Sequence, residues 1–179
     1  MACPVCGWVY RVNLYEARPP IVADERTQLI GWLNLQRMLV RRKLEGLRVE
    51  DEHRVVFPDS PLMTPAGLVS HLRWDEHLWF EVVYLNVPRD ENPTFRKDVE
   101  NADMRVEGVP LAQLLDEFDA QWARSNEIIA AHSLDDVGRD PEFAPSLRWI
   151  VIHVVEETAR HVGHLDTMRE LLDGQKGYY

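Results

Sequence analysis

The chain has 179 residues, of which 45% are hydrophobic, and its formal net charge at pH 7 is -10. This length and apolar content predict one folded domain with a sizeable core rather than a disordered chain. The acidic balance argues against nucleic acid and anionic membranes as partners, because such surfaces are bound by clustered Lys and Arg.

The N-terminal region, residues 1–22, is predicted to be an irregular extension of a helical domain over 23–173, which a flexible tail over 174–179 follows. It lacks the charged start and apolar core of a signal peptide. No apolar run approaches the roughly 20 residues that span a bilayer, so we expect a cytoplasmic protein. Cys3 and Cys6 have the spacing of half a zinc ribbon or of a redox pair, but no second half follows, and their role is left open.

The first two predicted helices cover residues 24–45 and 64–86. The first has an acidic first turn, which suits a helix N-terminus, and Gly46 follows its last residue. The second begins with Thr64 as the N-cap and Pro65 in the first helical position, a strong start signal. Its core-facing stripe is predicted to contain Leu68, His71, Asp75, Leu78, Val82 and Leu85.

A long polar connection over residues 87–108 precedes a third predicted helix over 110–131. A connection of this length indicates a crossover along the fold or a functional lid. After another polar loop, Ser146 caps a fourth predicted helix that runs to Leu172. Four helices without a convincing strand predict an all-α four-helix bundle with a crossover between its second and third helices.

Two polar residues interrupt the apolar stripe of the fourth predicted helix. Glu157 and His161 are four residues apart, so they lie one turn apart on one face of the helix. Burial of an unpaired carboxylate costs several kcal/mol, and a metal ion would compensate both groups. The apolar members of the stripe are Ile150, Val154, Leu165, Met168 and Leu172.

A third ligand is predicted on the second helix, where His71 also falls on the core face. Two His and one carboxylate form a common open ligand set for a catalytic divalent ion, which leaves positions for water or substrate. Zinc is the first candidate, and nickel, iron or manganese fit the same ligands. Asp75, one turn after His71, is a candidate fourth ligand or an acceptor for an imidazole N–H. The alternatives are a hydrogen-bonded structural His71 and an exposed Glu157–His161 ion pair.

Other side chains near this face have less definite roles. His164, three residues after His161, is a candidate alternative ligand, general base or polar rim residue, and His153 borders the stripe. Arg160 and Arg148 are candidates for steering an anionic group, or else solvated surface residues. Five tryptophans are expected to serve packing, namely Trp32, Trp74, Trp79, Trp122 and Trp149.

Two segments resemble the DinB superfamily, also called the DinB/YfiT-like metalloenzymes. The segment from Thr64 to His71, TPAGLVSH, is similar to the second-helix segment of that family. The segment from Glu157 to His164, ETARHVGH, is similar to its fourth-helix motif, often His-x-x-x-His-x-Gly-Gln. The match places His71 and His161 at family ligand positions, with Glu157 where many members have His.

The resemblance covers roughly residues 20–173 and points to an actinobacterial-type branch. The resulting His-Glu-His set is similar to that of mycothiol-dependent maleylpyruvate isomerase in the same superfamily. The superfamily implies a bundle with a crossover between the second and third helices, often dimeric, and several members use mycothiol, bacillithiol or glutathione as the thiol.

Three hypotheses for function follow. The first is a metal-dependent S-transferase or isomerase that uses a low-molecular-weight thiol of the mycothiol type as cosubstrate. The second is a metal-dependent hydrolase in which His164 or Asp75 assists the attack of activated water. The third is a non-catalytic bundle that binds a metal or another ligand.

Overall fold

The computed structural model describes residues 17–176. Cys3 and Cys6 lie outside this range, as do residues 177–179 of the predicted tail. Within it the chain is all-α and forms no strand, which confirms the predicted fold class. The four helices are α1 (Glu25–Leu44), α2 (Pro65–His77), α3 (Leu111–Ala131) and α4 (Leu147–Asp173).

Short polar side chains start three of these helices. The side chains of Asp24, Thr64 and Ser146 each accept a hydrogen bond from the backbone N–H three residues later, which satisfies a donor that the helix itself leaves unpaired. Gly174 ends α4 in the left-handed conformation, with φ of 77°. The starts of α1, α2 and α4 and the end of α4 therefore follow from local chemistry that is readable in the sequence.

Helix α2 continues into a π-helical segment, Leu78–Tyr84. The predicted helix over 64–86 thus has the right extent but not a uniform hydrogen-bond spacing. Asn86 follows with φ of 60°, a left-handed conformation that Asn tolerates better than most residues, and the helical path ends there.

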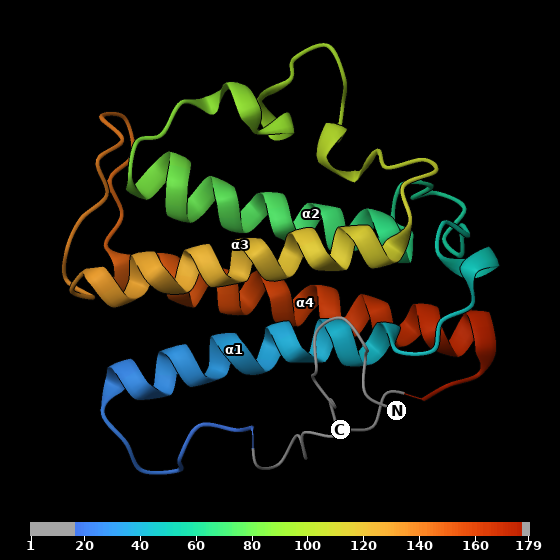
Figure 1. The fold of residues 1–179 in the computed structure, drawn as a ribbon, viewed down its shortest axis with the longest axis horizontal. Coiled ribbons are helices and arrows are strands. Elements are labelled where there is room, and N and C mark those ends of the chain that lie inside the picture. Colours follow the sequence, from blue (N-terminus) through green and yellow to red (C-terminus); the bar gives the residue numbers. More distant parts are fainter. Residues whose placement is uncertain (1–16, 177–179) are drawn as a thin grey trace.

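The helices form a bundle in which α1 packs against α4 and α2 packs against α3 (Figure 1). Figure 1 shows that α1 and α4 run in one direction and α2 and α3 in the other. The connection over residues 87–108 therefore returns along the length of the bundle, as the predicted crossover requires. It contains three short 3-10 turns, Arg89–Glu91, Pro93–Phe95 and Ala102–Met104.

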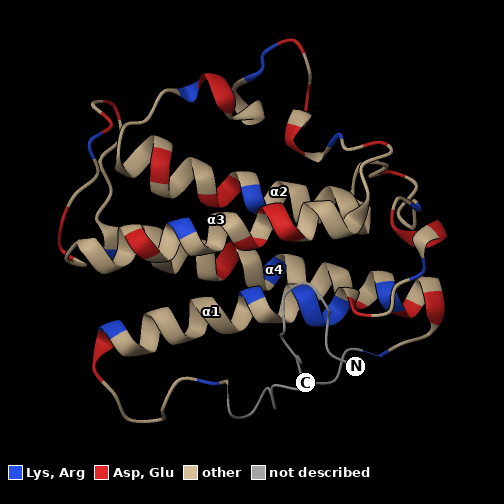
Figure 2. Ribbon diagram, viewed as in Figure 1, with Lys and Arg blue, Asp and Glu red and all other residues tan. Residues whose placement is uncertain are grey.

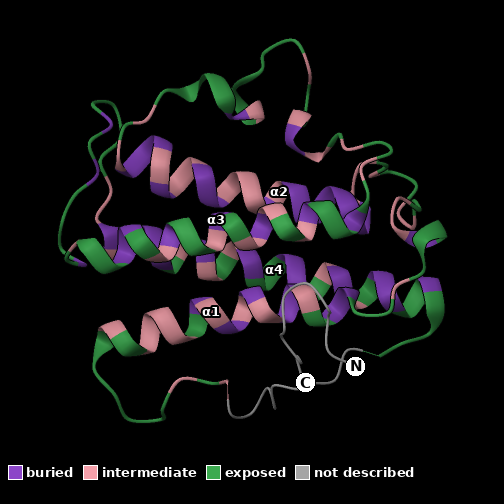
Figure 3. Cartoon of the chain, viewed as in Figure 1, coloured by how far each residue is buried: buried purple, intermediate pink, exposed green. Residues whose placement is uncertain are grey.

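The bundle core consists of two apolar clusters, and buried residues alternate with more exposed ones along the helices (Figure 3). One cluster uses the end of α1 and the start of α2, and the other lies toward the opposite ends of these helices. Buried polar residues occupy the helix positions between the clusters. This middle layer contains Arg37, Glu76, Gln121, Ser125, Thr158 and His161.

Charged residues occur along the helices and on the crossover (Figure 2). Basic residues gather where α1 and α4 end, whereas acidic residues are spread over residues 17–176. None of the helices within residues 17–176 is both long and apolar enough to cross a membrane.

Candidate metal centre

Three predicted ligands meet in the middle layer of the bundle. His71 on α2 and Glu157 and His161 on α4 each offer one donor atom, and the three atoms lie within 4.8 Å of one another. Glu157 Oε1 lies 3.0 Å from His161 Nε2 and 3.5 Å from His71 Nε2. The side chains of His71, Glu157 and His161 are 24%, 14% and 11% exposed, so solvent reaches a largely enclosed cluster.

Helix geometry accounts for this convergence. The four-residue spacing places Glu157 and His161 one above the other on α4. Thr158 beside them is buried and donates its hydroxyl to the carbonyl of Val154, whereas Glu156 points outward and is exposed. Helix α2 supplies His71 from the facing side.

Each imidazole of this triad also has a partner on its other nitrogen. His71 Nδ1 lies 2.6 Å from Oδ2 of Asp103, a buried residue in the turn Ala102–Met104 of the crossover. His161 Nδ1 lies 3.2 Å from Nδ1 of His164. Outer partners of this kind orient metal-ligating imidazoles.

The sequence pattern identified His164 as a neighbour of the site but missed Asp103. The crossover has no periodicity that would place one of its acidic residues inward. The position of Asp103 depends on how the crossover docks onto α2, which no local signal in the sequence reports.

The electrostatics of the triad favour a cation. Burial opposes the charge on Glu157, but the neighbouring imidazoles outweigh this effect and lower the pKa of its carboxyl. Burial, together with the nearby His71, lowers the pKa of His161. Burial also works against a charged His71, but the hydrogen bond and charge of Asp103 prevail and raise its pKa. Glu157 and His161 thus favour the protonation states in which these groups bind metals, whereas a metal would have to displace the proton that the raised pKa of His71 favours.

Asp75 was predicted to be either a fourth metal ligand or an acceptor for an imidazole N–H, and its contacts differ from both. It is not one of the three converging donors, and the acceptor for the His71 imidazole is Asp103 instead. Its Oδ1 accepts a hydrogen bond from Trp79 Nε1 at 3.0 Å, while Oδ2 is buried with no hydrogen-bond partner. Burial raises the pKa of Asp75 to about 7.

The two candidate arginines differ in their distance from the triad. Arg160 donates to Glu157 Oε2 at 3.0 Å and also pairs with Glu156, and its side chain is 54% exposed. It therefore forms a charged rim beside the site. Arg148 pairs with Glu25 at 2.8 Å near the start of α4 and makes no contact with the triad.

An aromatic cluster lies on α4 before the triad. The rings of His153 and Trp149 are stacked within 9° of parallel, and Trp79 meets His153 edge-on at 4.4 Å between centroids. Trp32 and Trp149 are 41% and 44% exposed. These two rings are therefore only partly buried, and Trp149 packs against both His153 and Trp79.

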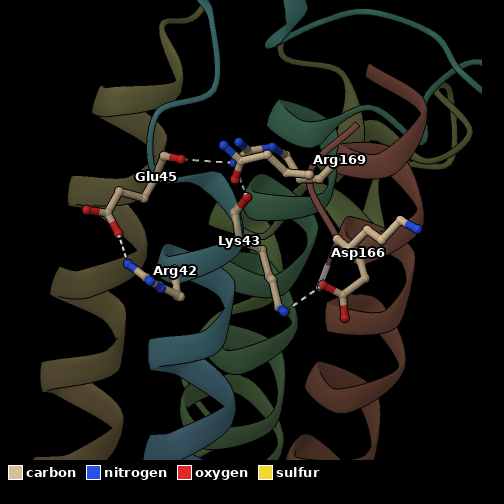
Figure 4. A pocket seen from close by; sticks show the side chains of 7 residues that line it. Arg42, Lys43, Glu45, Asp166 and Arg169 are labelled. Carbon is tan, nitrogen blue, oxygen red and sulfur yellow. Dashed lines mark hydrogen bonds and ion pairs between the residues drawn. The ribbon is translucent and has the colours of Figure 1, made fainter. Parts of the chain in front are cut away.

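A separate pocket of about 320 Å³ lies where α1 and α4 end (Figure 4). Two of its cations, Lys43 and Arg169, are engaged within the fold. Lys43 Nζ lies 2.7 Å from Asp166 Oδ1, and Arg169 donates to the backbone carbonyls of Lys43 and Glu45. These contacts tie the end of α4 to the end of α1, and the pocket does not include the triad. Its lining residues are Arg42, Lys43, Glu45, Asp166, Arg169, Gln175 and Lys176.

Comparison with known proteins identifies a family to which the chain is similar. A search of curated proteins found no significant match, and neither did a search of solved structures. The family model described as mycothiol-S-transferase matches residues 28–174, a range that begins within α1 and ends just after α4. It therefore covers nearly the whole bundle and all three residues of the triad. The chain belongs to the mycothiol-S-transferase family, a DinB-like family, as the resemblance of its second and fourth helices implies.

Proposed function

We propose that this protein is a metal-dependent S-transferase that joins a low-molecular-weight thiol of the mycothiol type to an electrophilic substrate. The observation that carries the proposal is the convergence of His71, Glu157 and His161 in a chain of the mycothiol-S-transferase family. Zinc is the first candidate for the metal, with nickel, iron or manganese as alternatives that suit the same donors.

The donor set fits a divalent ion. Two imidazole nitrogens and one carboxylate oxygen come from facing helices, and three protein ligands leave positions for a further ligand. When bound, such an ion would favour the thiolate form of the thiol, which is the form that attacks electrophiles.

The remaining steps fall to side chains around the triad. His164, next to His161, is the candidate acceptor for the proton that the thiol loses. Arg160 on the rim would hold an anionic group of the substrate. The sulfur then forms a bond to the electrophilic carbon, and the leaving group departs with the electron pair of its bond to that carbon.

Metal analysis of the purified protein tests the first half of this proposal. Wild type should contain about one divalent ion per chain, and His71→Ala and His161→Ala should lose it. His132→Ala is the matched control, because His132 bonds the carbonyl of Ile128 at the end of α3 and lies outside the triad. Absence of metal from wild type after reconstitution would contradict the metal dependence.

An assay with and without thiol tests the second half. Consumption of an electrophile such as 1-chloro-2,4-dinitrobenzene should require both the loaded protein and mycothiol. Turnover of an ester or amide without any thiol would instead support the hydrolase. A metal-loaded protein inactive with every thiol would support a binding role.

A further inference from the structure

We infer that Asp103, a residue of the crossover, is the positioning residue that fixes His71 for metal binding, so that crossover docking and metal occupancy are coupled. This inference rests on the proposed metal centre. It deepens that proposal because it makes the connection between α2 and α3 part of the site.

The first argument concerns the hydrogen on the His71 imidazole. An ionised carboxylate only accepts hydrogen bonds, so the 2.6 Å contact with Asp103 Oδ2 places the hydrogen on Nδ1. When the imidazole is neutral, its Nε2 lone pair is then free on the side of Glu157 and His161. Without Asp103, the carboxylate of Glu157, at 3.5 Å from Nε2, is the remaining acceptor, and the hydrogen would move to the nitrogen that must ligate the metal.

The second argument concerns how Asp103 is held. Ser70, the residue before His71, donates its hydroxyl to the backbone carbonyl of Asp103 at 2.5 Å. Gly67 lies one turn earlier, and a Cβ at that position would lie 3.3 Å from the carbonyl oxygen of Met104. The absence of a side chain at Gly67 thus lets the turn of the crossover approach the backbone of α2 closely.

A second anchor fixes the other end of the crossover. Asn92 is buried, and its Nδ2 donates to the carbonyl of Trp74 at 3.0 Å and lies 3.1 Å from His77 Nδ1. The residues between the two anchors are mostly exposed. The crossover is therefore attached to α2 at two points, and one of them ends on a metal-ligating imidazole.

The coupling between crossover docking and metal binding follows from thermodynamic linkage. If docking of the turn strengthens metal binding by some factor, metal binding must strengthen docking by the same factor. The structure thus predicts that a metal at the triad protects the backbone of the turn, although no backbone atom of the turn is a ligand.

Zinc affinity tests the positioning role. Affinity is measured by competition with a chromophoric chelator for wild type, Asp103→Ala, Asp103→Asn and Asp98→Ala. Asp103→Ala should weaken zinc binding about 10–100-fold. Asp103→Asn should lose less, because its amide oxygen still accepts from Nδ1. Asp98→Ala is the matched control, since Asp98 lies on the same crossover, is 68% exposed and pairs only with Arg96 among the salt bridges found.

Two further measurements separate positioning from a merely structural role. Nitrogen-15 NMR of the metal-free protein, at a pH where His71 is neutral, should show the Nδ1–H tautomer in wild type and a shift toward Nε2–H in Asp103→Ala. Hydrogen exchange of the amides of residues 102–104 should slow when zinc is added to wild type but not to Asp103→Ala.

The outcomes separate this inference from the proposed function. If Asp103→Ala keeps both the wild-type tautomer and the wild-type zinc affinity, the inference is overturned. If wild type binds no zinc but its tautomer still depends on Asp103, the metal part of the proposed function fails while the orienting role of Asp103 stands. Circular dichroism of each variant shows whether the fold is retained, and Asp103→Asn supplies the comparison if Asp103→Ala does not fold.

Discussion

The buried ion pair between Arg37 and Glu76 offers a sharp test of the packing of the middle layer. Arg37 on α1 donates from Nε and Nη2 to the two carboxylate oxygens of Glu76 on α2, each at 2.6 Å. The two side chains are 0% and 1% exposed. Arg37 Nη1 donates as well to Asn34 and Asn126, at 3.0 and 2.9 Å, so the guanidinium joins three helices. We predict that Arg37→Met is more damaging than removal of both charges.

The expected loss in the free energy of unfolding depends on which buried groups each variant leaves without a partner. Arg37→Met leaves the carboxylate of Glu76 buried without a counter-charge, which costs about 3–5 kcal/mol of the free energy of unfolding. That is a large part of the ~5–15 kcal/mol typical of a folded domain. The double variant Arg37→Met/Glu76→Leu buries no charge and loses mainly the two bonds to Asn34 and Asn126, at about 1 kcal/mol each. Its expected loss is therefore about 2 kcal/mol, smaller than that of Arg37→Met alone.

Urea denaturation followed by circular dichroism measures these differences in the metal-free protein. The cycle contains wild type, Arg37→Met, Glu76→Leu and the double variant. Arg42→Met is the control on the same helix, because Arg42 and its partner Glu45 are 58% and 60% exposed. Such a surface pair contributes about 0–1 kcal/mol. The reasoning is refuted if Arg37→Met costs no more than Arg42→Met, or if the losses of the two single variants simply add in the double variant.

Three further predictions concern single positions. Gly67→Ala should lower the free energy of unfolding by about 1–3 kcal/mol in urea denaturation, because its Cβ would overlap the carbonyl oxygen of Leu62; an unchanged midpoint would show that the backbone yields easily. Ser146→Ala should cost about 1 kcal/mol by removing the side-chain acceptor for the N–H of Trp149, and an unchanged melting temperature would count against that cap. The pKa of Asp75 is raised to about 7, so this carboxyl binds a proton more tightly in the folded protein than in the unfolded chain. In the metal-free protein this carboxyl should therefore lower the free energy of unfolding progressively from about pH 4 to pH 7, by up to about 1.4 kcal/mol per pH unit. Asp75→Asn should remove this pH dependence, and equal pH slopes of the free energy of unfolding in the two proteins would contradict the prediction.

The helices were predictable because their ends are set by neighbouring residues. The sequence predicts helices over 24–45, 110–131 and 146–172, and the structure has them within one residue at each end. Caps and glycine stops act within one turn, so they can be recognised without knowledge of the fold. The π-helical spacing of Leu78–Tyr84 was not predictable in this way. Its apolar pattern continues that of α2, and we have no account of the change in terms of local sequence.

In the candidate site, too, the features set by local spacing were predictable and those that depend on the fold were not. Glu157 and His161 were recognised because two polar residues at helical spacing interrupt an apolar stripe, and His71 does the same on α2. Asp103 was not recognised, because its contact with His71 depends on which segments meet in space. The hydrogen bond that Trp79 donates to Asp75 was not recognised either. Prediction from periodicity therefore identified the residues of the triad and the neighbouring His164, but not Asp103, the partner of His71.

The middle layer of the bundle also explains why a cation suits this position. The other buried polar groups of the layer are matched within the fold: Arg37 with Glu76, and the hydroxyl of Thr158 with a helix carbonyl. At the triad, one carboxylate oxygen of Glu157 faces two imidazoles, and in the metal-free protein a proton on His71 supplies the compensating charge. Such compensation is lost as the pH rises through the raised pKa of His71, whereas a divalent ion held by the same three side chains supplies positive charge without that proton. The polar residues that weaken the apolar core at its centre are thus the ones best placed to bind a metal there.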